Sequence, residues 1–189
     1  MRKFKISVLL KLGFYCLFLS IGLEMQARKF VHPGILHTTK SIERMRAQIA
    51  DKEYPAYGSF ELLKSHHCSQ ADYQPFGPFE IISRDGEFRH TKSKMEQDFS
   101  AVYQNALMWV LTGEKTHAEK SLELLLGYAG TLKRIPETND APLLVGLEGL
   151  KIIYATEILR HTYKKMTVVQ FNEISRMIRE AVSYTHLRA

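Results

Sequence analysis

Apolar residues recur at helical spacing through the centre of the chain. Between residues 95 and 111 they follow an i, i+3, i+4, i+7 pattern, which places them on one helix face, and Gly113 is a typical stop signal. The residues of this face are Met95, Phe99, Val102, Ala106, Leu107, Val110 and Leu111. Patterns of the same period cover residues 118–132, with Thr116 as the predicted cap, and residues 143–158. Because helices joined by short turns lie antiparallel, the pattern predicts helical hairpins.

Shorter elements flank these hairpins. Thr38 or Thr39 is predicted to cap a first helix, whose apolar face comprises Ile42, Met45 and Ile49. A second short helix is expected over residues 56–64, and a last one over residues 167–179. The sequence therefore predicts an all-helical domain, and we find no fixed-period repeat that would indicate a tetratricopeptide-type array.

The first 27 residues have the features of a secretory signal peptide. A basic start is followed by an apolar run over residues 12–23 and by Met25-Gln-Ala27, a plausible cleavage site. An uncleaved membrane anchor is the alternative, and Cys16 lacks the preceding small residues of a lipoprotein. Either way we expect export to a periplasm or the outside, with membrane contact only through this segment. Cys68 is then the sole thiol, which excludes an internal disulfide.

The net charge changes little in this picture. The formal charge is +6, but the first 27 residues carry four lysines and arginines against one glutamate, so the remainder is only about +3. That balance allows an acidic polymer as a partner. It falls short of a basic nucleic-acid-binding stripe, and no nucleic-acid motif is present, so no nucleic-acid partner is expected.

Residues 65–94 lose the helical period and are predicted to form a long loop, of the kind that is usually functional or mobile. Cations and aromatic rings alternate in it: Tyr73, Phe76, Phe79, Arg84, Phe88, Arg89, His90, Lys92 and Lys94. A guanidinium can fork a carboxylate while a ring packs on a pyranose, so this composition suits an acidic sugar. The alternative is a solvated loop pinned by its aromatic side chains.

Histidines precede the single remaining cysteine of this loop. His66, His67 and Cys68 are consecutive, and His90 follows further on, so a metal site can be imagined there. We favour a polar loop that happens to be rich in histidine. No metal ligand is therefore predicted.

The C-terminal residues change in character. The run from Val182 to Ala189 resembles the translation of a sequencing adapter. We therefore expect residues 183–189 to be a non-native tail and the native protein to depart near Ala181. The predicted helical domain spans residues 28–182.

Three stretches together resemble the alginate lyase domain family of helical polysaccharide lyases. The first is Phe30-Val-His-Pro-Gly-Ile-Leu-His-Thr with Ser41-Ile-Glu-Arg-Met-Arg. The second is Asp98-Phe-Ser-Ala-Val-Tyr-Gln-Asn-Ala-Leu-Met-Trp, followed by Leu111-Thr-Gly-Glu. The third is Asn139-Asp-Ala-Pro-Leu-Leu-Val-Gly-Leu-Glu-Gly-Leu-Lys-Ile with Ala155-Thr-Glu-Ile-Leu-Arg-His-Thr-Tyr163. The resemblance covers residues 30–179.

The resemblance implies an (α/α) toroid, here incomplete, and cleavage of uronate-containing polysaccharides by β-elimination. In that family a base removes the C5 proton, an asparagine, often with an arginine, offsets charge on the C6 carboxylate, and a tyrosine protonates the leaving oxygen. That route needs neither a metal nor an organic cofactor. The family's Asn-His pair follows the last predicted helix and is absent from this sequence, so no catalytic residue is assigned, and neither His161 nor His186 is promoted to that role.

The candidates for binding the polymer are Arg84, Arg89, Tyr103 and Asn139. Trp109 could be a sugar platform, although a tryptophan on an apolar helix is more often part of the core. The function predicted from the sequence is an exported polysaccharide lyase that acts on an acidic, alginate-like polymer. In this chain it would be truncated before the catalytic motif. The alternative is a non-catalytic helical module that binds glycans or serves as a scaffold.

Overall fold

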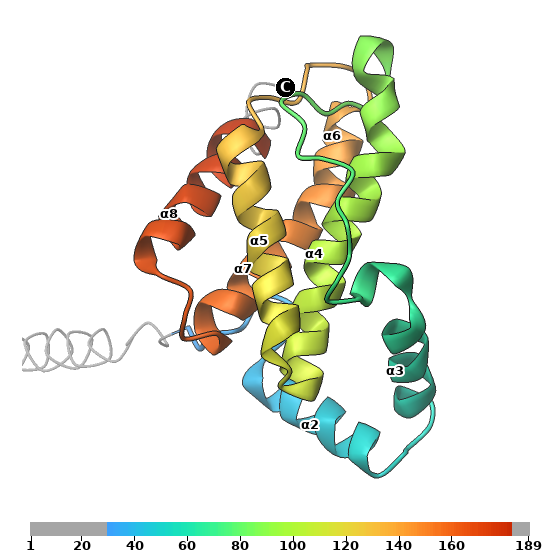
Figure 1. The fold of residues 1–189 in the computed structure, drawn as a ribbon. Helices are drawn as coiled ribbons and strands as arrows, with labels where there is room; N and C mark the ends of the chain where they lie inside the picture. The colour runs from blue at the N-terminus through green and yellow to red at the C-terminus, as the bar shows by residue number, and fades with distance from the viewer. Residues whose placement is uncertain (1–29, 183–189) are drawn as a thin grey trace, which may run out of the picture. The chain divides into compact units, whose positions relative to one another are not determined.

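The computed structural model describes residues 30–182, and all of these except Phe30 belong to one compact unit. Figure 1 shows this unit as a bundle of helices, with α4 and α5 side by side at its centre. The described residues contain no strand, so the all-α class is confirmed. Closure into a toroid stays a prediction. The predicted signal segment, residues 1–27, and the predicted tail, residues 183–189, lie outside the described residues.

The first two helices are short and close together in sequence. Helix α2 spans Thr39–Ala50, and Thr38 caps it through a capping box in which its side chain and that of Ser41 each accept a backbone N–H. Helix α3 spans Ala56–Ser65 after a break of five residues. Both helices agree with the sequence prediction.

Helices α4 (Lys92–Thr112) and α5 (Lys115–Thr131) form the predicted hairpin. Gly113 ends α4 in the left-handed conformation, with φ of 80°, which a glycine adopts without steric cost. The predicted cap at Thr116 is wrong: α5 begins earlier, its cap is Glu114, and Thr116 lies inside the helix. The buried side chains of α4, including Phe99 and Val102, face the buried side of α5 and create the core.

The third predicted helix is interrupted. It begins as α6 (Ala141–Leu144), widens into a π-helical turn, η3 (Val145–Gly149), and continues as α7 (Leu150–Thr162). Backbone angles stay right-handed helical at the junctions, so the chain keeps its direction through the turn. Three leucines remain about half exposed along this stretch: Leu143, Leu147 and Leu150.

The last helix, α8, spans Val168–Met177 and packs against α5. Thr167 caps it through a second capping box with Gln170, and a π-helical turn, η4 (Ile178–Val182), follows. Within the described residues, no helix has both the length and the apolar character needed to cross a bilayer.

The long loop is confirmed between α3 and α4, but its predicted end is wrong: Lys92 and Lys94 belong to the first turn of α4. The loop is also anchored to the core. It contains two 3-10 turns, η1 (His67–Ser69) and η2 (Gly86–Thr91), and one isolated parallel bridge between Ile81 and Arg134. Tyr73 is buried and Phe79 packs against the core, while Phe76 is half exposed. Two of its aromatic side chains therefore fix the loop to the core, as predicted under the alternative of a loop pinned by its aromatic side chains.

Candidate functional site

Three of the four predicted substrate-binding residues lie near the N-terminal end of α4. Arg84 precedes η2, and its guanidinium lies 3.9 Å from Glu96 Oε1 and 3.8 Å from Asp140 Oδ2. Its Nε is buried without a hydrogen-bond partner. Asn139 is exposed on the turn next to Asp140, so Arg84 and Asn139 are near neighbours. Arg89 is exposed on η2 and has no ion pair within the described part of the chain.

The fourth predicted residue, Tyr103, lies about 10 Å further along α4 than Glu96. Its hydroxyl oxygen is 2.6 Å from His37 Nε2, and the two rings stack with centroids 6.0 Å apart. The Tyr154 ring of α7 also lies 6.0 Å from the Tyr103 ring. Residues from the N-terminal segment, α4 and α7 therefore form one small aromatic cluster, which consists of His37, Tyr103 and Tyr154.

Burial sets the protonation of this cluster. Desolvation lowers the pKa of His37, because a charged imidazole is disfavoured away from water. Desolvation, with a smaller contribution from the neighbouring Tyr154, raises the pKa of Tyr103 to about 12. At neutral pH the cluster therefore combines a neutral imidazole with a protonated phenol, and one hydrogen bond joins them.

A polar contact connects α4 and α7 about one turn before the aromatic cluster in the sequence of both helices. Lys151 donates to Ser100 Oγ at 3.0 Å and to Glu148 Oε2 at 2.7 Å. Ser100 in turn donates to the backbone carbonyl of Glu96 at 2.7 Å, next to the Arg84 site. We call this strip along α4 and α7, from Arg84 to Tyr103, the α4–α7 face.

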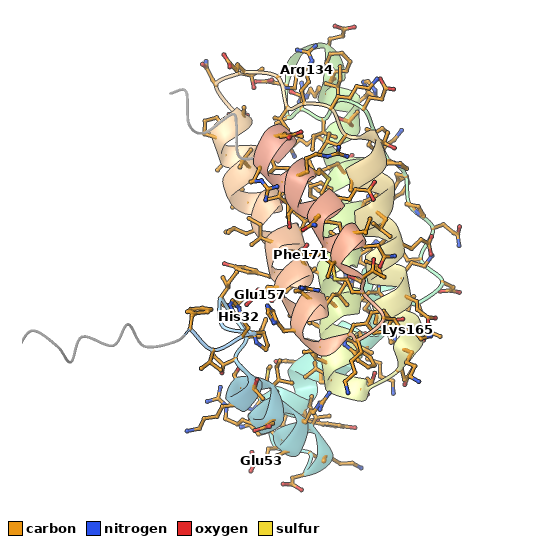
Figure 2. All side chains as sticks on the ribbon, turned by 90° about the vertical axis from the view of Figure 1, so that its left-hand side faces the viewer. His32, Glu53, Arg134, Glu157, Lys165 and Phe171 are labelled. Atoms are coloured by element: carbon orange, nitrogen blue, oxygen red, sulfur yellow. The ribbon has the colours of Figure 1, made fainter. Side chains whose placement is uncertain are left out.

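A second polar cluster lies where the N-terminal segment meets α7. His32 Nδ1 is 2.6 Å from Glu157 Oε1, and Gly34 N–H donates to the same oxygen at 3.2 Å. The other carboxylate oxygen lies 3.4 Å from His161 Nε2. The two imidazoles stack at 4.2 Å with planes 8° apart. Figure 2 shows His32 beside Glu157, although the two are 125 positions apart in sequence.

Sequence reasoning missed a buried carboxylate at the centre of the fold. Asp98 is fully buried on α4, and Oδ1 accepts from the Tyr73 hydroxyl at 2.8 Å and from Phe76 N–H at 3.0 Å. Oδ2 accepts from the Tyr128 hydroxyl at 2.7 Å and from Gly77 N–H at 2.8 Å. Four donors therefore satisfy this carboxylate, and it fixes the long loop to the α4–α5 hairpin.

A second buried polar group lies on the same helix. Asn105 Nδ2 donates to the carbonyls of Cys68, Gln70 and Ala101 at 3.0–3.3 Å. Its side-chain oxygen is therefore left to accept from His117 Nδ1 at 2.8 Å. Burial lowers the pKa of His117, against a smaller opposing effect of Glu114. Both polar groups on α4 are fully buried and have structural partners.

The histidine-rich loop resolves into a local cluster. Cys68 is buried, with Sγ 3.2 Å from His67 Nε2, while His66 Nδ1 accepts from the Cys68 N–H. His90 lies on η2 and does not join the three. Burial is the main effect that raises the pKa of the Cys68 thiol, which disfavours the thiolate that a metal needs.

Trp109 has the structural role that we preferred. Its indole N–H donates to Thr162 Oγ1 at 2.9 Å, and its ring meets Tyr163 edge to face at 5.6 Å. The ring thereby joins α4 to the end of α7.

Elsewhere an apolar cavity of about 210 Å³ lies between α2, α3 and α4. Its walls include Met45, Ile49, Phe60, Leu63, Leu107 and Leu111.

Comparisons of the chain with protein-family models, curated proteins and solved structures returned no match. The resemblance to the alginate lyase domain family therefore rests on the sequence motifs alone. The activity that it implies is a proposal.

Proposed function

We propose that the protein is an exported polysaccharide lyase that cleaves a uronate-containing polymer by β-elimination. In this proposal the α4–α7 face contributes to polymer binding. The observation that supports it best is the aromatic cluster of His37, Tyr103 and Tyr154, in line with Arg84 at the head of α4. A uronate can pack its sugar ring on an aromatic side chain and bind a guanidinium through its carboxylate. Both groups are present on this face.

The chemistry of β-elimination requires a base, an acid and a group that meets the charge growing on the C6 carboxylate. His37 and Tyr103 have the residue types and protonation states of the first two. Within the described residues, neither has a lysine, arginine or asparagine among its hydrogen-bond partners. We therefore assign this pair to binding and expect the catalytic groups in an Asn-His pair and a tyrosine that follow the last helix.

Charge balance limits how strongly this face can attract a polyanion. Arg84 faces Glu96 and Asp140, and Lys151 is bonded to Glu148. A uronate carboxylate must exchange with these acidic groups, which offsets much of the gain. Arg89 is exposed on η2 and is the more available cation.

The pairing of these cations with acidic groups also supports the alternative, a non-catalytic helical module that binds glycans or serves as a scaffold. Such a protein needs the face but not the catalytic groups.

The half-exposed leucines of the α6–α7 stretch favour the toroid, because a neighbouring hairpin would cover them in a ring of hairpins.

One measurement separates the candidates, and a second tests the face that both of them use. Long-read sequencing of the source gene across codon 182 tests whether the reading frame continues into an Asn-His pair, as the lyase proposal expects. Titration of a polyuronate into the present chain tests the face: we expect binding without formation of the conjugated double bond that β-elimination creates. Absence of binding would contradict the assignment of the face in both candidates.

A further inference from the structure

We propose that His32, Glu157 and His161 form a binding site for a divalent transition cation, and that zinc suits it best. One ligand atom from each residue lies within 4.8 Å of the others. Two imidazoles and a carboxylate make up a common zinc ligand set, which leaves a fourth position for water. This site is separate from the proposed polymer-binding face and does not depend on the proposed function.

The local structure positions two of the ligands. Glu157 and His161 are one turn apart on α7, so their side chains project from the same helix face. Their ligand atoms, Oε2 and Nε2, are 3.4 Å apart. With bonds of about 2.0–2.1 Å, two ligands of a tetrahedral zinc ion are separated by about 3.4 Å. This pair therefore already has the spacing that the ion requires.

The N-terminal segment supplies the third ligand and orients the carboxylate. His32 Nδ1 lies 2.6 Å from Glu157 Oε1, and Gly34 N–H donates to that oxygen. A hydrogen bond to the ligating carboxylate is the kind of second contact that fixes a metal ligand in place. Oε2 is left facing His161.

Exposure allows the rings to adjust. The side chains of His32 and His161 are 44% and 29% exposed, whereas that of Glu157 is 14% exposed. The imidazoles now stack face to face, and each must turn about its side-chain bonds to direct a nitrogen at the cation. Because both rings border solvent, they can turn without disturbing the core, and the ion has a path to the site. The nearby guanidinium of Arg160 is directed to α8, where it lies over the Phe171 ring.

A cation here would link residue 32 to residues 157 and 161. Such a link closes a long loop of the chain, which is where a metal clip contributes most to stability in principle. We expect a structural consequence: the cation would hold the N-terminal segment, including His37, more firmly against α7.

The test is zinc binding by the chain after dialysis against a chelator, measured by competition with a chromophoric zinc indicator. We expect one zinc per chain, and at least tenfold weaker binding in His161→Ala and in Glu157→Gln. Both variants are first checked by circular dichroism. Zinc should also raise the Tm of the wild type and leave that of His161→Ala unchanged. The matched control is the double variant His66→Ala, His67→Ala, which removes two exposed histidines from the other cluster.

Three results would overturn the proposal. Zinc could fail to bind the wild type, or it could bind His161→Ala and Glu157→Gln as tightly as the wild type. It could also be lost only in the His66→Ala, His67→Ala variant, which would place the ion on η1. If His161→Ala does not fold, His161→Asn replaces it, because the amide retains a polar side chain at this half-exposed position.

Discussion

The Tyr128 hydroxyl of α5 donates to Asp98 Oδ2 of α4 at 2.7 Å, in the fully buried centre of the hairpin. Tyr73 and two loop amides donate to the same carboxylate. A side chain at Gly77 would collide with the Tyr128 hydroxyl, so the loop can approach this closely only with glycine there. One acidic residue thus determines how the long loop lies on the hairpin.

Replacing Asp98 by alanine should destabilise the fold by at least about 3 kcal/mol, because it leaves two buried hydroxyls and two partly buried amides without their acceptor. Urea unfolding followed by circular dichroism measures the loss. Glu96→Ala is the matched control: this carboxylate lies on the same helix but is partly exposed and pairs with Lys92, and its loss should change the free energy of unfolding by less than about 1 kcal/mol. Equal effects of the two substitutions would contradict the structural role of Asp98.

Stability should fall steeply in alkali. Burial, followed by the hydrogen bond and the charge of Asp98, raises the pKa of both Tyr73 and Tyr128. The folded state then keeps protons that the unfolded state releases above about pH 10, so each tyrosine should remove about 1.4 kcal/mol of stability per pH unit beyond that point. Unfolding curves between pH 9 and about pH 11 measure the slope.

Phenylalanine variants test where this slope comes from. Tyr73→Phe and Tyr128→Phe should each reduce it, and the double variant should reduce it further. Each hydroxyl should also contribute about 1.5–3 kcal/mol at neutral pH through its bond to the carboxylate. An unchanged alkaline slope in the double variant would show that other groups dominate it.

Acidification should destabilise the protein through His117. Burial lowers its pKa in the folded state, so the unfolded state binds the proton first. The stabilising contribution is complete above about pH 6.5 and decreases as the pH falls from there toward the folded pKa. Burial also lowers the pKa values of His37 and His161, which act in the same direction.

The variant His117→Gln isolates the buried group. It keeps an amide donor near Asn105 and cannot be protonated, so it should lose less stability than the wild type between pH 7 and about pH 5. Thermal unfolding over this range makes the comparison. If both proteins lose the same stability, the acid response arises elsewhere.

Polyuronate binding should depend on the α4–α7 face and on η2. We expect Tyr103→Ala to weaken binding about tenfold, because it removes an aromatic ring on which a sugar can pack. Arg89→Ala should weaken binding several-fold, roughly the 1 kcal/mol of one exposed charged contact. Titration calorimetry at two salt concentrations makes the measurement, since contacts of exposed charges weaken with salt. Arg176→Ala on α8 and Tyr54→Ala, both exposed, are the controls. Equal losses in controls and test variants would rule out a localised site.

Local sequence signals predicted the helices because they act over one or two turns. Thr38 and Thr167 each have a polar partner three residues later, and both capping boxes are present. Thr116 misled because the turn after Gly113 is shorter than a cap at that position requires, so α5 starts at Lys115. The π-helical turn of Val145–Gly149 leaves the apolar period nearly intact and was therefore not visible in the pattern.

The buried polar groups followed from no spacing rule. Asp98 and Asn105 occupy positions i and i+7 of the buried α4 face, and polar residues at such positions were the available signal. Their partners come from other elements: Tyr128 lies 30 positions from Asp98, and His117 lies 12 from Asn105. The cluster of His32, Glu157 and His161 likewise depends on a contact across 125 positions.

The most direct test of the lyase proposal is the ultraviolet absorbance of a polyuronate incubated with the protein expressed from the complete reading frame. β-Elimination creates a conjugated double bond, so the proposal predicts a steady rise in absorbance that requires no added cofactor. A polymer that binds without any rise in absorbance would contradict lyase activity and favour the glycan-binding module.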